Sequence, residues 1–531
     1  MPSRDWPLPT FGLCRDHTRM LSAYPFLRLS ACWRVLIMSL HKCCVRGLLK
    51  MKQELYIDDI PGECRIALLE DDVVVEIDID RSTNQSQIGN IYWGRADSVV
   101  PSLQAAFLTL DTGPQGFLSI REANTLYPKD GSGRPRIESI IHEGQWVLVQ
   151  VSKDSAGDKG PRLTANPSMA GRFLVYQPLK DGIAISSRIR DEAERARLTE
   201  AMQQVINKVD CEGGFIIRTV AEGADIDVLV HEAETLASQW AAVDLNPPTG
   251  GNPTCMYRDL EPRERALRDW AMPEIAKIIT EGRELFAATK KYTDAHMPDL
   301  SDRLEVHTGS ELLFEEAGIE AAIDEALETR MDLPTGGWLS IESTEALTAI
   351  DVNSGGFKQE GDREQIALKT NLAAVPVIAR QLRLRDMGGQ IVVDFINMRD
   401  QAHRSEVGDA MDAALKRDRA PTQILGWTRM GLMELTRRRT RKTLPDFLTG
   451  ERRLQSTRVR SVESTGYDIL RLAHLEADCS PSGTIKIGAH KSVVGWLNGG
   501  PLSRLSSHLS RTMEAATEDD MAIDEFDLYS E

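Results

Sequence analysis

The sequence predicts a multidomain protein built from α/β and α+β units. Its 531 residues are enough for three or more domains with large cores. Two regions carry the prediction. Residues 88–152 contain short β-rich runs separated by Gly, Pro and Asp, and residues 336–443 alternate between strand and helix patterns.

Composition narrows the class of protein. The hydrophobic share of 41% and the charged share of 27% are ordinary for a globular chain. There is no apolar run of about 18 residues, so we expect neither a transmembrane helix nor stable membrane insertion. The formal net charge of −17 argues against a protein that binds polyanions by charge alone, but it allows a nucleic-acid enzyme with local basic groups.

The first 50 residues differ from the rest. They hold four of the eight cysteines, and eight basic residues against two acidic ones. They match a secretory signal poorly. We expect residues 1–50 to be an extension that is disordered or not native, with an amphipathic leader as the alternative. The other cysteines are isolated, without a Cys-x-x-Cys spacing, which favours a reducing, cytoplasmic location.

The expected elements follow in order. Residues 65–80 predict a β-hairpin, and 88–152 predict a small OB-type barrel that ends at the Gly/Asp/Lys loop 153–162. A mixed unit continues to a Pro/Gly-rich break at 244–254, and helix is predicted over 262–292. After the α/β section we expect a smaller α+β unit. The last 18 residues hold eight acids and no base, which predicts a solvated tail.

Two carboxylates stand at or near the ends of predicted strands in the α/β section. Asp394 lies in "QIVVDFINM", a run typical of a buried strand, and Asp351 lies in "LTAIDVNSGG". A buried unpaired carboxylate is costly, whereas strand ends are where open α/β sheets bind ligands. Two such acids can share a Mg²⁺ ion, with Asn353 on the same face to orient a ligand. The simpler alternative is that each Asp caps the following helix or pairs with a nearby arginine.

Longer segments of the sequence indicate a protein family more specifically than the spacing of the two acids does. The segments "STEALTAIDVNSGG", "NLAAVPVIARQLRLRDMGGQIVVDFINM" and "GLMELTRRR" resemble the catalytic domain of the ribonuclease E/G family. Upstream, "NIYWGRADSVVPSLQAAFLTLDTGPQGFLSI" resembles its S1-type OB barrel, and "LTANPSMAGRFLVY" and "GFIIRTVAEGA" resemble its 5′-end sensor. The resemblance covers about residues 52–500, and the chain length is closer to the ribonuclease G branch than to full-length ribonuclease E.

The resemblance implies an RNase H-like subdomain split around the barrel and the sensor, then a DNase I-like catalytic subdomain and a small C-terminal α+β domain. The expected divisions are the extension, 1–50; the first RNase H-like segment, 51–86; the S1/OB barrel, 87–162; the 5′-sensor, 163–255; the second RNase H-like segment, 256–326; the DNase I-like subdomain, 327–443; the C-terminal domain, 444–510; and an acidic tail, 511–531.

The resemblance also implies an activity. A member of this family is expected to be a metal-dependent endoribonuclease that hydrolyses single-stranded RNA to 5′-phosphate and 3′-hydroxyl ends, in rRNA and mRNA processing and decay. Asp351 and Asp394 match the family's magnesium-binding acids, and Asn353 matches the polar residue beside them. We expect RNA, not DNA, as the partner.

Other residues match RNA contacts of the family. Phe107, Phe117 and Lys159 match residues of the barrel that bind RNA, although strand alternation alone would place either Phe in the core. The pocket for a 5′-monophosphate is matched by Gly171, Val175, Arg218 and Thr219. The basic runs "TRRRTRK" and "RQLRLR" are expected to guide phosphates beside the acids, with solvated helix faces as the alternative.

Three positions depart from the family. The Cys-Pro-x-Cys zinc link between two subunits is missing from "TLPDFLTGERRL", so we expect no zinc, and any homo-oligomer must form through other contacts. Pro421 replaces a basic residue of the 5′-phosphate pocket, which predicts a weaker preference for monophosphorylated ends. Asn397 replaces the second acid of "IDFIDM", which removes a negative charge near the metal.

Two other functions remain open. The first is an RNA-binding paralogue that keeps the barrel but cleaves weakly or not at all. Two costly buried acids favour the enzyme, because a protein that only binds has no use for them. The second is a metal-dependent phosphoesterase for small substrates, against which the barrel with Phe107 and Phe117 argues.

Overall fold

The computed structural model describes residues 51–531 except 112, 128–134, 156–158, 210, 356–361, 440, 450–458 and 481. The predictions for residues 1–50 lie outside the described residues, as do portions of "TLPDFLTGERRL" and "TRRRTRK". Within the described portion of the chain, no helix is both long enough and apolar enough to cross a membrane.

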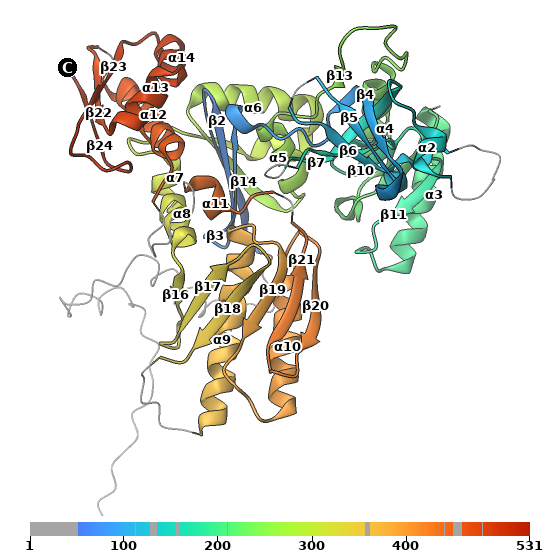
Figure 1. The fold of residues 1–531 in the computed structure, drawn as a ribbon. Coiled ribbons are helices and arrows are strands. Elements are labelled where there is room, and N and C mark those ends of the chain that lie inside the picture. Colours follow the sequence, from blue (N-terminus) through green and yellow to red (C-terminus); the bar gives the residue numbers. More distant parts are fainter. Residues whose placement is uncertain are drawn as a thin grey trace, which may run out of the picture. The chain divides into compact units, whose positions relative to one another are not determined.

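The first sheet is assembled from two distant stretches of the chain. It contains β1 (Gln53–Ile60), β2 (Glu63–Glu70), β3 (Val73–Arg81), β14 (Ile275–Glu281) and β15 (Leu304–His307), in the order β15-β14-β1-β2-β3. The first three strands are antiparallel, whereas β14 runs parallel to β1 and β15 runs parallel to β14. The hairpin predicted over 65–80 is confirmed, and the chain between β3 and β14 is an insertion into this sheet (Figure 1).

The continuous helix predicted over 262–292 is wrong. Strand β14 lies between α5 (Pro262–Trp270) and α6 (Arg283–His296). Ile275, Ile278 and Ile279 of β14 are buried between β1 and β15, where β-branched side chains pack well. The helical pattern on both sides of this short run obscured the strand.

The β-rich region closes into a five-stranded barrel. Its strands pair in the order β4 (Ile91–Val100), β5 (Ala105–Thr109), β6 (Gly116–Ser119), β8 (Arg162–Thr164) and β7 (Trp146–Lys153), and β7 pairs back to β4. This closure is consistent with an OB-type barrel. The loop 153–162 does not end the barrel as expected, because the fifth strand, β8, follows it. The edge strand β13 (Thr254–Tyr257) pairs with β4 outside the closed ring.

A smaller sheet follows the barrel. Its order is β11 (Gly182–Ile185), β12 (Gly214–Ile217), β10 (Leu174–Gln177) and β9 (Met169–Ala170). Helices α3 (Glu192–Val209) and α4 (Ile226–Ala241) share one hydrophobic core with these strands. Short helices elsewhere are α2 (Ile137–Ile140), α7 (Leu313–Glu316), α8 (Ile319–Leu327) and α11 (Leu444–Leu448).

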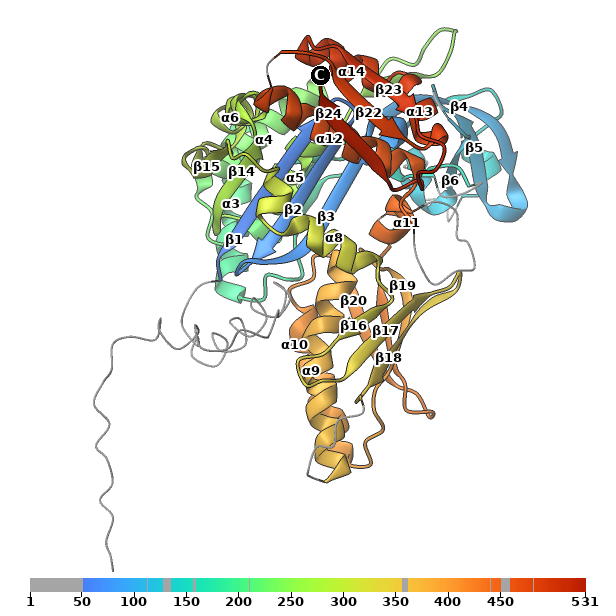
Figure 2. The same ribbon diagram turned by 90° about the vertical axis from the view of Figure 1, so that its left-hand side faces the viewer.

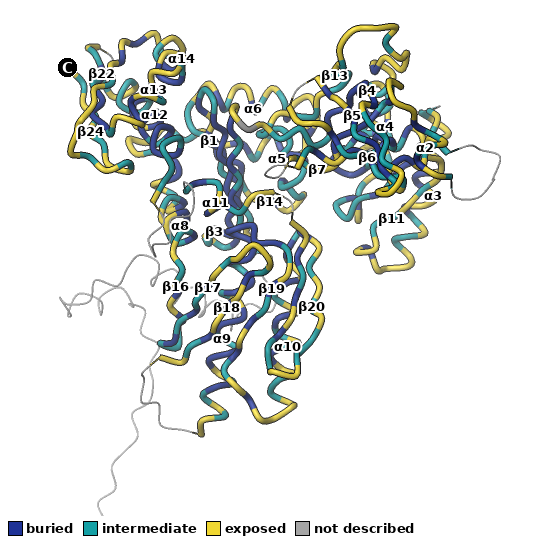
Figure 3. The backbone as a smooth tube through the Cα atoms, in the orientation of Figure 1, coloured by how far each residue is buried: buried dark blue, intermediate teal, exposed yellow. Residues whose placement is uncertain are grey.

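The α/β section forms a six-stranded sheet. The order is β16 (Arg330–Asp332), β17 (Trp338–Ser343), β18 (Leu347–Asn353), β19 (Gly389–Asp394), β21 (Met433–Arg437) and β20 (Thr422–Trp427). Strand β21 includes Thr436 and Arg437, the first two residues of the basic run "TRRRTRK". Helices α9 (Arg363–Leu384) and α10 (Gln401–Leu415) share a core with one face of the sheet, and Figure 2 shows α9 running along it. The burial pattern alternates along β17 and β18, so the other face is open (Figure 3).

The C-terminal region is an α+β unit that continues to the end of the chain. Helices α12 (Val462–Cys479), α13 (Lys491–Asn498) and α14 (Pro501–Leu509) pack with the sheet β23 (Met513–Thr517), β22 (Ile485–Ala489) and β24 (Phe526–Ser530). The solvated acidic tail expected over 511–531 is therefore wrong. Phe526 and Leu528 pack against the core while the acids between them and beside them face water. The RNase H-like and DNase I-like names stay predictions.

Candidate functional site

Asp351 and Asp394 lie side by side at the carboxyl ends of two strands. Strands β18 and β19 are parallel, and their pairing register places Asp351 opposite Asp394. Neighbouring strands are about 4.8 Å apart, so both carboxylates share one small area of the open face. The Nδ2 amide of Asn353 donates a hydrogen bond of 2.8 Å to Oδ2 of Asp351. The structure thus brings the three predicted residues together.

Both acids are exposed, and the expectation of buried carboxylates is wrong. On β19, Ile391 and Val393 are buried, whereas Val392 and Asp394 lie on the open side. The run "QIVVDF" suggested a strand covered on both faces because Val392 is apolar as well. Only one face is covered, so Asp394 keeps its hydration.

In the part of the chain that the structure describes, neither acid caps a helix or pairs with an arginine, which was the simpler alternative. Asp362 caps α9 by accepting a hydrogen bond from the backbone of Glu364, and Asp400 caps α10 in the same way. Among the described residues, no lysine or arginine forms an ion pair with Asp351 or Asp394. Like charges directly opposite each other on neighbouring strands are destabilising. A cation bound between these two carboxylates would remove that repulsion.

The donor set fits Mg²⁺. This ion prefers oxygen ligands and commonly takes one or two protein carboxylates while it keeps several waters. The bond from Asn353 fixes the orientation of one carboxylate, as partners of metal ligands usually do. The described residues contain no group of three or more His, Cys, Asp or Glu that could hold a metal. An ion at the acid pair would therefore keep positions for water and substrate oxygens.

Helix α9 fixes the chain just after Asp394. The fully buried Asn371 donates from Nδ2 to the carbonyl of Ile396 at 2.8 Å and accepts from its N–H at 3.0 Å. Asn397, the position that departs from the family, is exposed next to this clamp, and its Oδ1 lies 3.5 Å from Nη2 of Arg404. Asn371 was not predicted from the sequence; a lone Asn on the apolar side of a predicted helix was the available signal.

Glu364 holds the turn that follows. It accepts hydrogen bonds from the backbone of Arg399 and Asp400 and contacts Nδ1 of His403 at 3.1 Å. The Arg399 N–H and the other two donors lower the pKa of Glu364 to about 2. Its carboxylate therefore stays ionised and keeps the turn in place over the whole neutral range.

Phe107 and Phe117 form a pair on the outside of the barrel. The pairing of β5 and β6 places them opposite each other, and their ring centroids are 5.6 Å apart at an angle of 66°. Each Phe is partly exposed, while the next residues along the strands, Leu108 and Leu118, are fully buried. The core alternative is therefore wrong for both rings.

Basic side chains lie beside this aromatic pair. Lys159 is exposed, and its loop runs next to β6 because the N–H of Phe117 donates to the carbonyl of Pro161 at 2.8 Å. Arg162 pairs with Phe117 across β6 and β8, and Lys153 pairs with Arg162 across β7 and β8. Lys153 and Arg162 are exposed and were missed from the sequence, although they flank the loop singled out for Lys159.

The structure gathers the four residues predicted for the 5′-phosphate pocket in one sheet region. Arg218 donates from Nη1 to the carbonyl of Gly171 at 2.5 Å, and its Nη2 pairs with Asp269 at 2.8 Å. Thr219 lies 2.9 Å from the Ser186 hydroxyl. Val175 lies on β10, which pairs with β12 directly before Arg218. The Arg218 guanidinium is thus positioned by the protein and has one carboxylate partner already.

Glycine is required at position 171. A Cβ there would lie 2.6 Å from the carboxyl carbon of Glu232. That carboxylate accepts hydrogen bonds from three consecutive backbone N–H groups, those of Arg172, Phe173 and Leu174. The absence of a side chain lets Glu232 hold this turn, which carries the carbonyl that receives Arg218.

The basic run at 380–385 is not a phosphate track. Arg380 pairs with Glu325, and Arg385 is 1% exposed. Arg383 is buried and pairs with Glu70 and Glu76, two acids of the first sheet. In the second run, Arg437 is buried against Asp386 and Asp418, whereas Arg438 and Arg439 are exposed. Only a portion of the second run is therefore free to meet RNA phosphates.

A pocket of about 720 Å³ opens beside the second run. It is lined by Arg188, Gly389, Gln390, Pro421, Thr422, Gln423, Thr436, Arg437 and Arg438. Arg188 comes from the loop after β11 and donates to the carbonyl of Arg419 at 3.1 Å. Pro421 thus lines a pocket whose other lining residues include three arginines.

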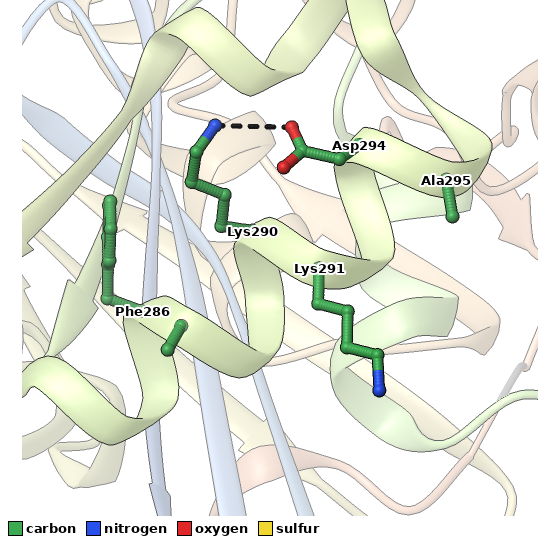
Figure 4. Close-up of a pocket in the computed structure, with 6 residues that line it drawn as sticks. Phe286, Lys290, Lys291, Asp294 and Ala295 are labelled. Carbon is green, nitrogen blue, oxygen red and sulfur yellow. Dashed lines mark hydrogen bonds and ion pairs between the residues drawn. The ribbon is translucent and has the colours of Figure 1, made fainter.

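A second hollow, of about 620 Å³, lies along α6 and is lined by Phe286, Ala287, Lys290, Lys291, Asp294 and Ala295. Figure 4 shows Lys290 facing Asp294, with which it forms an ion pair of 3.1 Å. All its lining residues come from one helix, and none is a predicted site residue. We assign it no role in the site.

Comparison with known proteins decides the family. The sequence profile of the "Ribonuclease E/G family" matches residues 168–440. Ribonuclease G of Haemophilus influenzae is 36% identical over 426 residues, which cover 79% of this chain and 86% of that protein. The chain belongs to the ribonuclease E/G family. The resemblance inferred from the sequence is confirmed.

Further relatives include both branches of the ribonuclease E/G family. Ribonuclease G of Escherichia coli strain K12 is 34% identical over 432 residues, 79% of this chain and 87% of that protein. Ribonuclease E of Haemophilus influenzae is 36% identical over 425 residues, which cover 78% of this chain but 45% of that protein. The match spans most of each ribonuclease G relative but less than half of the ribonuclease E relative, so in extent this chain is closer to ribonuclease G.

Proposed function

We propose that this protein is a Mg²⁺-dependent endoribonuclease that hydrolyses single-stranded RNA to 5′-phosphate and 3′-hydroxyl ends, in rRNA and mRNA processing and decay in the cytoplasm. Membership of the ribonuclease E/G family supports RNA as the substrate. The observation that carries the proposal is the exposed, in-register pair Asp351 and Asp394, which has no cationic partner among the described residues.

The chain's own residues have distinct roles in this reaction. When bound, Mg²⁺ would polarise the scissile phosphate and lower the pKa of a bound water. Asp351 and Asp394 would hold the ion, and Asn353 keeps the Asp351 carboxylate in one orientation. Asn371 fixes the backbone that follows Asp394, which limits the movement of that carboxylate.

The alternative, an RNA-binding paralogue without cleavage, must be judged on new grounds. Because both acids are exposed, neither has the energetic cost of burial, and the argument from buried acids no longer holds. The juxtaposition of two like charges now favours cleavage, because it has no structural use that we can identify. Any self-association would use contacts other than the zinc link, because the segment "TLPDFLTGERRL" contains no cysteine.

Cleavage of an end-labelled single-stranded RNA tests the proposal. With Mg²⁺ we expect discrete products whose new 5′ ends are substrates for an exonuclease that requires a 5′-phosphate. EDTA should abolish the products, and duplex RNA and single-stranded DNA of the same sequence should stay intact. Tight RNA binding with no product in either Mg²⁺ or Mn²⁺ would support the binding-only paralogue instead.

The aromatic pair of the barrel gives a prediction about affinity. Phe107→Ala and Phe117→Ala should each weaken binding of single-stranded RNA by about 5- to 100-fold, because each removes a ring on which a base can stack. The rings touch each other, so the double variant should lose less than the product of the two factors. Fluorescence anisotropy without Mg²⁺ measures this. Unchanged affinity in both single variants would remove the rings from the RNA interface.

The sensor gives a prediction about 5′ ends. The wild type should cleave 5′-monophosphate and 5′-hydroxyl RNAs with similar kcat/KM, because Pro421 replaces a basic residue of the family's 5′-phosphate pocket. Pro421→Arg should raise the preference for the monophosphate roughly tenfold, since it adds one charge-assisted hydrogen bond. Arg218→Gln should remove whatever preference exists. A strong monophosphate preference in the wild type would contradict our interpretation of Pro421.

A further inference from the structure

A tryptophan lies on the open face of the six-stranded sheet, next to the acid pair Asp351 and Asp394. Trp338 on β17 pairs with Asn353 on β18, and Ser340 pairs with Asp351. Residues opposite each other in an antiparallel pair point to the same face, and so do residues two apart on one strand. Trp338 therefore shares the face of the two acids. It is only partly buried, whereas its neighbour Leu339 is fully buried on the helix side.

An arginine covers this tryptophan. Arg330 on the edge strand β16 pairs with Ser340, so Arg330, Ser340, Asp351 and Asp394 form a row across four adjacent strands. The guanidinium carbon of Arg330 lies 4.6 Å from the centroid of the Trp338 ring. Within the described residues, its one ion pair is a 3.5 Å contact with Asp332, and both side chains are more than 60% exposed. Such pairs are weak, so a ligand can displace the guanidinium easily.

We propose that Trp338 and Arg330 form a subsite for the base of the nucleotide next to the scissile phosphate. The base stacks on the indole, and the displaced guanidinium covers the base or contacts the neighbouring phosphate. This inference rests on the proposed function, because it places the scissile phosphate at Asp351 and Asp394. Strand β17, which carries Trp338, lies about 4.8 Å from β18, which carries Asp351, and Trp338 is two residues along β17 from the residue opposite Asp351, so an adjacent nucleotide is within its reach.

The subsite also gives a physical reason for single-strand selectivity. A base in a duplex is stacked on both sides, so it cannot reach the indole without unstacking. A base in single-stranded RNA is free to do so, and every base has a face to stack, so the subsite is tolerant of sequence. The interaction should therefore position the strand and favour single strands without choosing the base.

An Arg–Trp contact by itself does not identify a subsite for a base. Arg95 and Trp146 form a similar cross-strand pair on the barrel, with the guanidinium 6.0 Å from the ring centroid. What distinguishes Trp338 is its place in the sheet. It lies two residues from Ser340, which stands directly opposite Asp351, and it lies opposite Asn353, which bonds to that acid.

An abasic scan tests the subsite. A single abasic residue is placed in turn at each position around a mapped cleavage site, and kcat/KM is measured for the wild type and for Trp338→Leu. In the wild type, we expect the abasic residue to lower kcat/KM by about 5- to 100-fold at one position next to the scissile bond. Trp338→Leu should cleave intact RNA more slowly by a similar factor and lose its sensitivity at that position only.

Two further variants keep the test decisive. Trp338→Phe retains a stacking face and should recover most of the rate and of the abasic sensitivity, while Tyr529→Ala, which truncates an exposed aromatic on β24, should change neither. The same abasic profile in the wild type and in Trp338→Leu would overturn the subsite. If the wild type cleaves no intact RNA at all, the proposed function itself fails.

Discussion

Asp394→Asn is expected to lower kcat/KM for single-stranded RNA by about a thousandfold or more, with no loss of stability. The magnitude follows from the several kcal/mol that a bound metal contributes to the stabilisation of transition-state charge. The variant removes half of the charge that would hold the ion, so the residual activity should need more Mg²⁺. Because Asp394 is exposed and has no described partner, the melting temperature should stay within the range of ordinary surface substitutions.

Kinetics at several Mg²⁺ concentrations measure this prediction. Asp351→Asn should behave in the same way, whereas Asn353→Ala should cost less, about 10- to 100-fold, because it only orients a ligand. Glu434→Gln is the matched control. Glu434 is an exposed acid on β21 and stands opposite Val392 on β19, two positions before Asp394, so it lies on the same open face. Full activity of Asp394→Asn would end the two-acid mechanism.

The sequence was most informative where local pattern and tertiary structure agree. The alternation of strands and helices predicted over 336–443 is confirmed, and α9 is one of its helices. The two acids were expected on neighbouring strand ends, and they lie in register on β18 and β19. Residue types and spacing were sufficient here because both strands belong to one short α/β unit.

Features that depend on distant stretches of the chain were missed. Arg383 pairs with Glu70, which lies 313 positions away in the sequence. From the sequence alone, the basic run 380–385 was therefore interpreted as an exposed surface. The open side of β19 could not be recognised because Val392 is apolar on that side too. Strand β14 completes a sheet begun more than 200 residues earlier in the chain, and local periodicity carries no such information. Trp338 was missed for the same reason, because its functional interpretation depends on the register of its strand with the strand that carries Asp351.

The largest effect on stability is expected from Arg471, a residue of the C-terminal α12. It is 2% exposed, donates to Asp58 on β1 at 2.6 Å and pairs with Glu63 on β2 at 2.5 Å. Burial alone would raise the pKa of both acids, but Arg471 and the buried Arg65 and Arg81 outweigh it and lower both pKa values below their ordinary range. Acids with lowered pKa values contribute stability above about pH 4, and this contribution is lost as the pH falls further.

Arg471→Met should therefore lower the free energy of unfolding at pH 7 by about 3–5 kcal/mol, the usual cost of removing one partner from a buried charge network. The loss should shrink as the pH falls from about 5 towards 3, since protonation of Asp58 and Glu63 removes the charges that lost their partner. Urea denaturation at several pH values measures both effects.

Lys486→Met breaks a 2.6 Å pair with Glu514 on the surface and should leave the free energy of unfolding nearly unchanged. A loss in Arg471→Met that does not vary with pH would mean that packing, and not the charge of Arg471, holds α12 against β1 and β2.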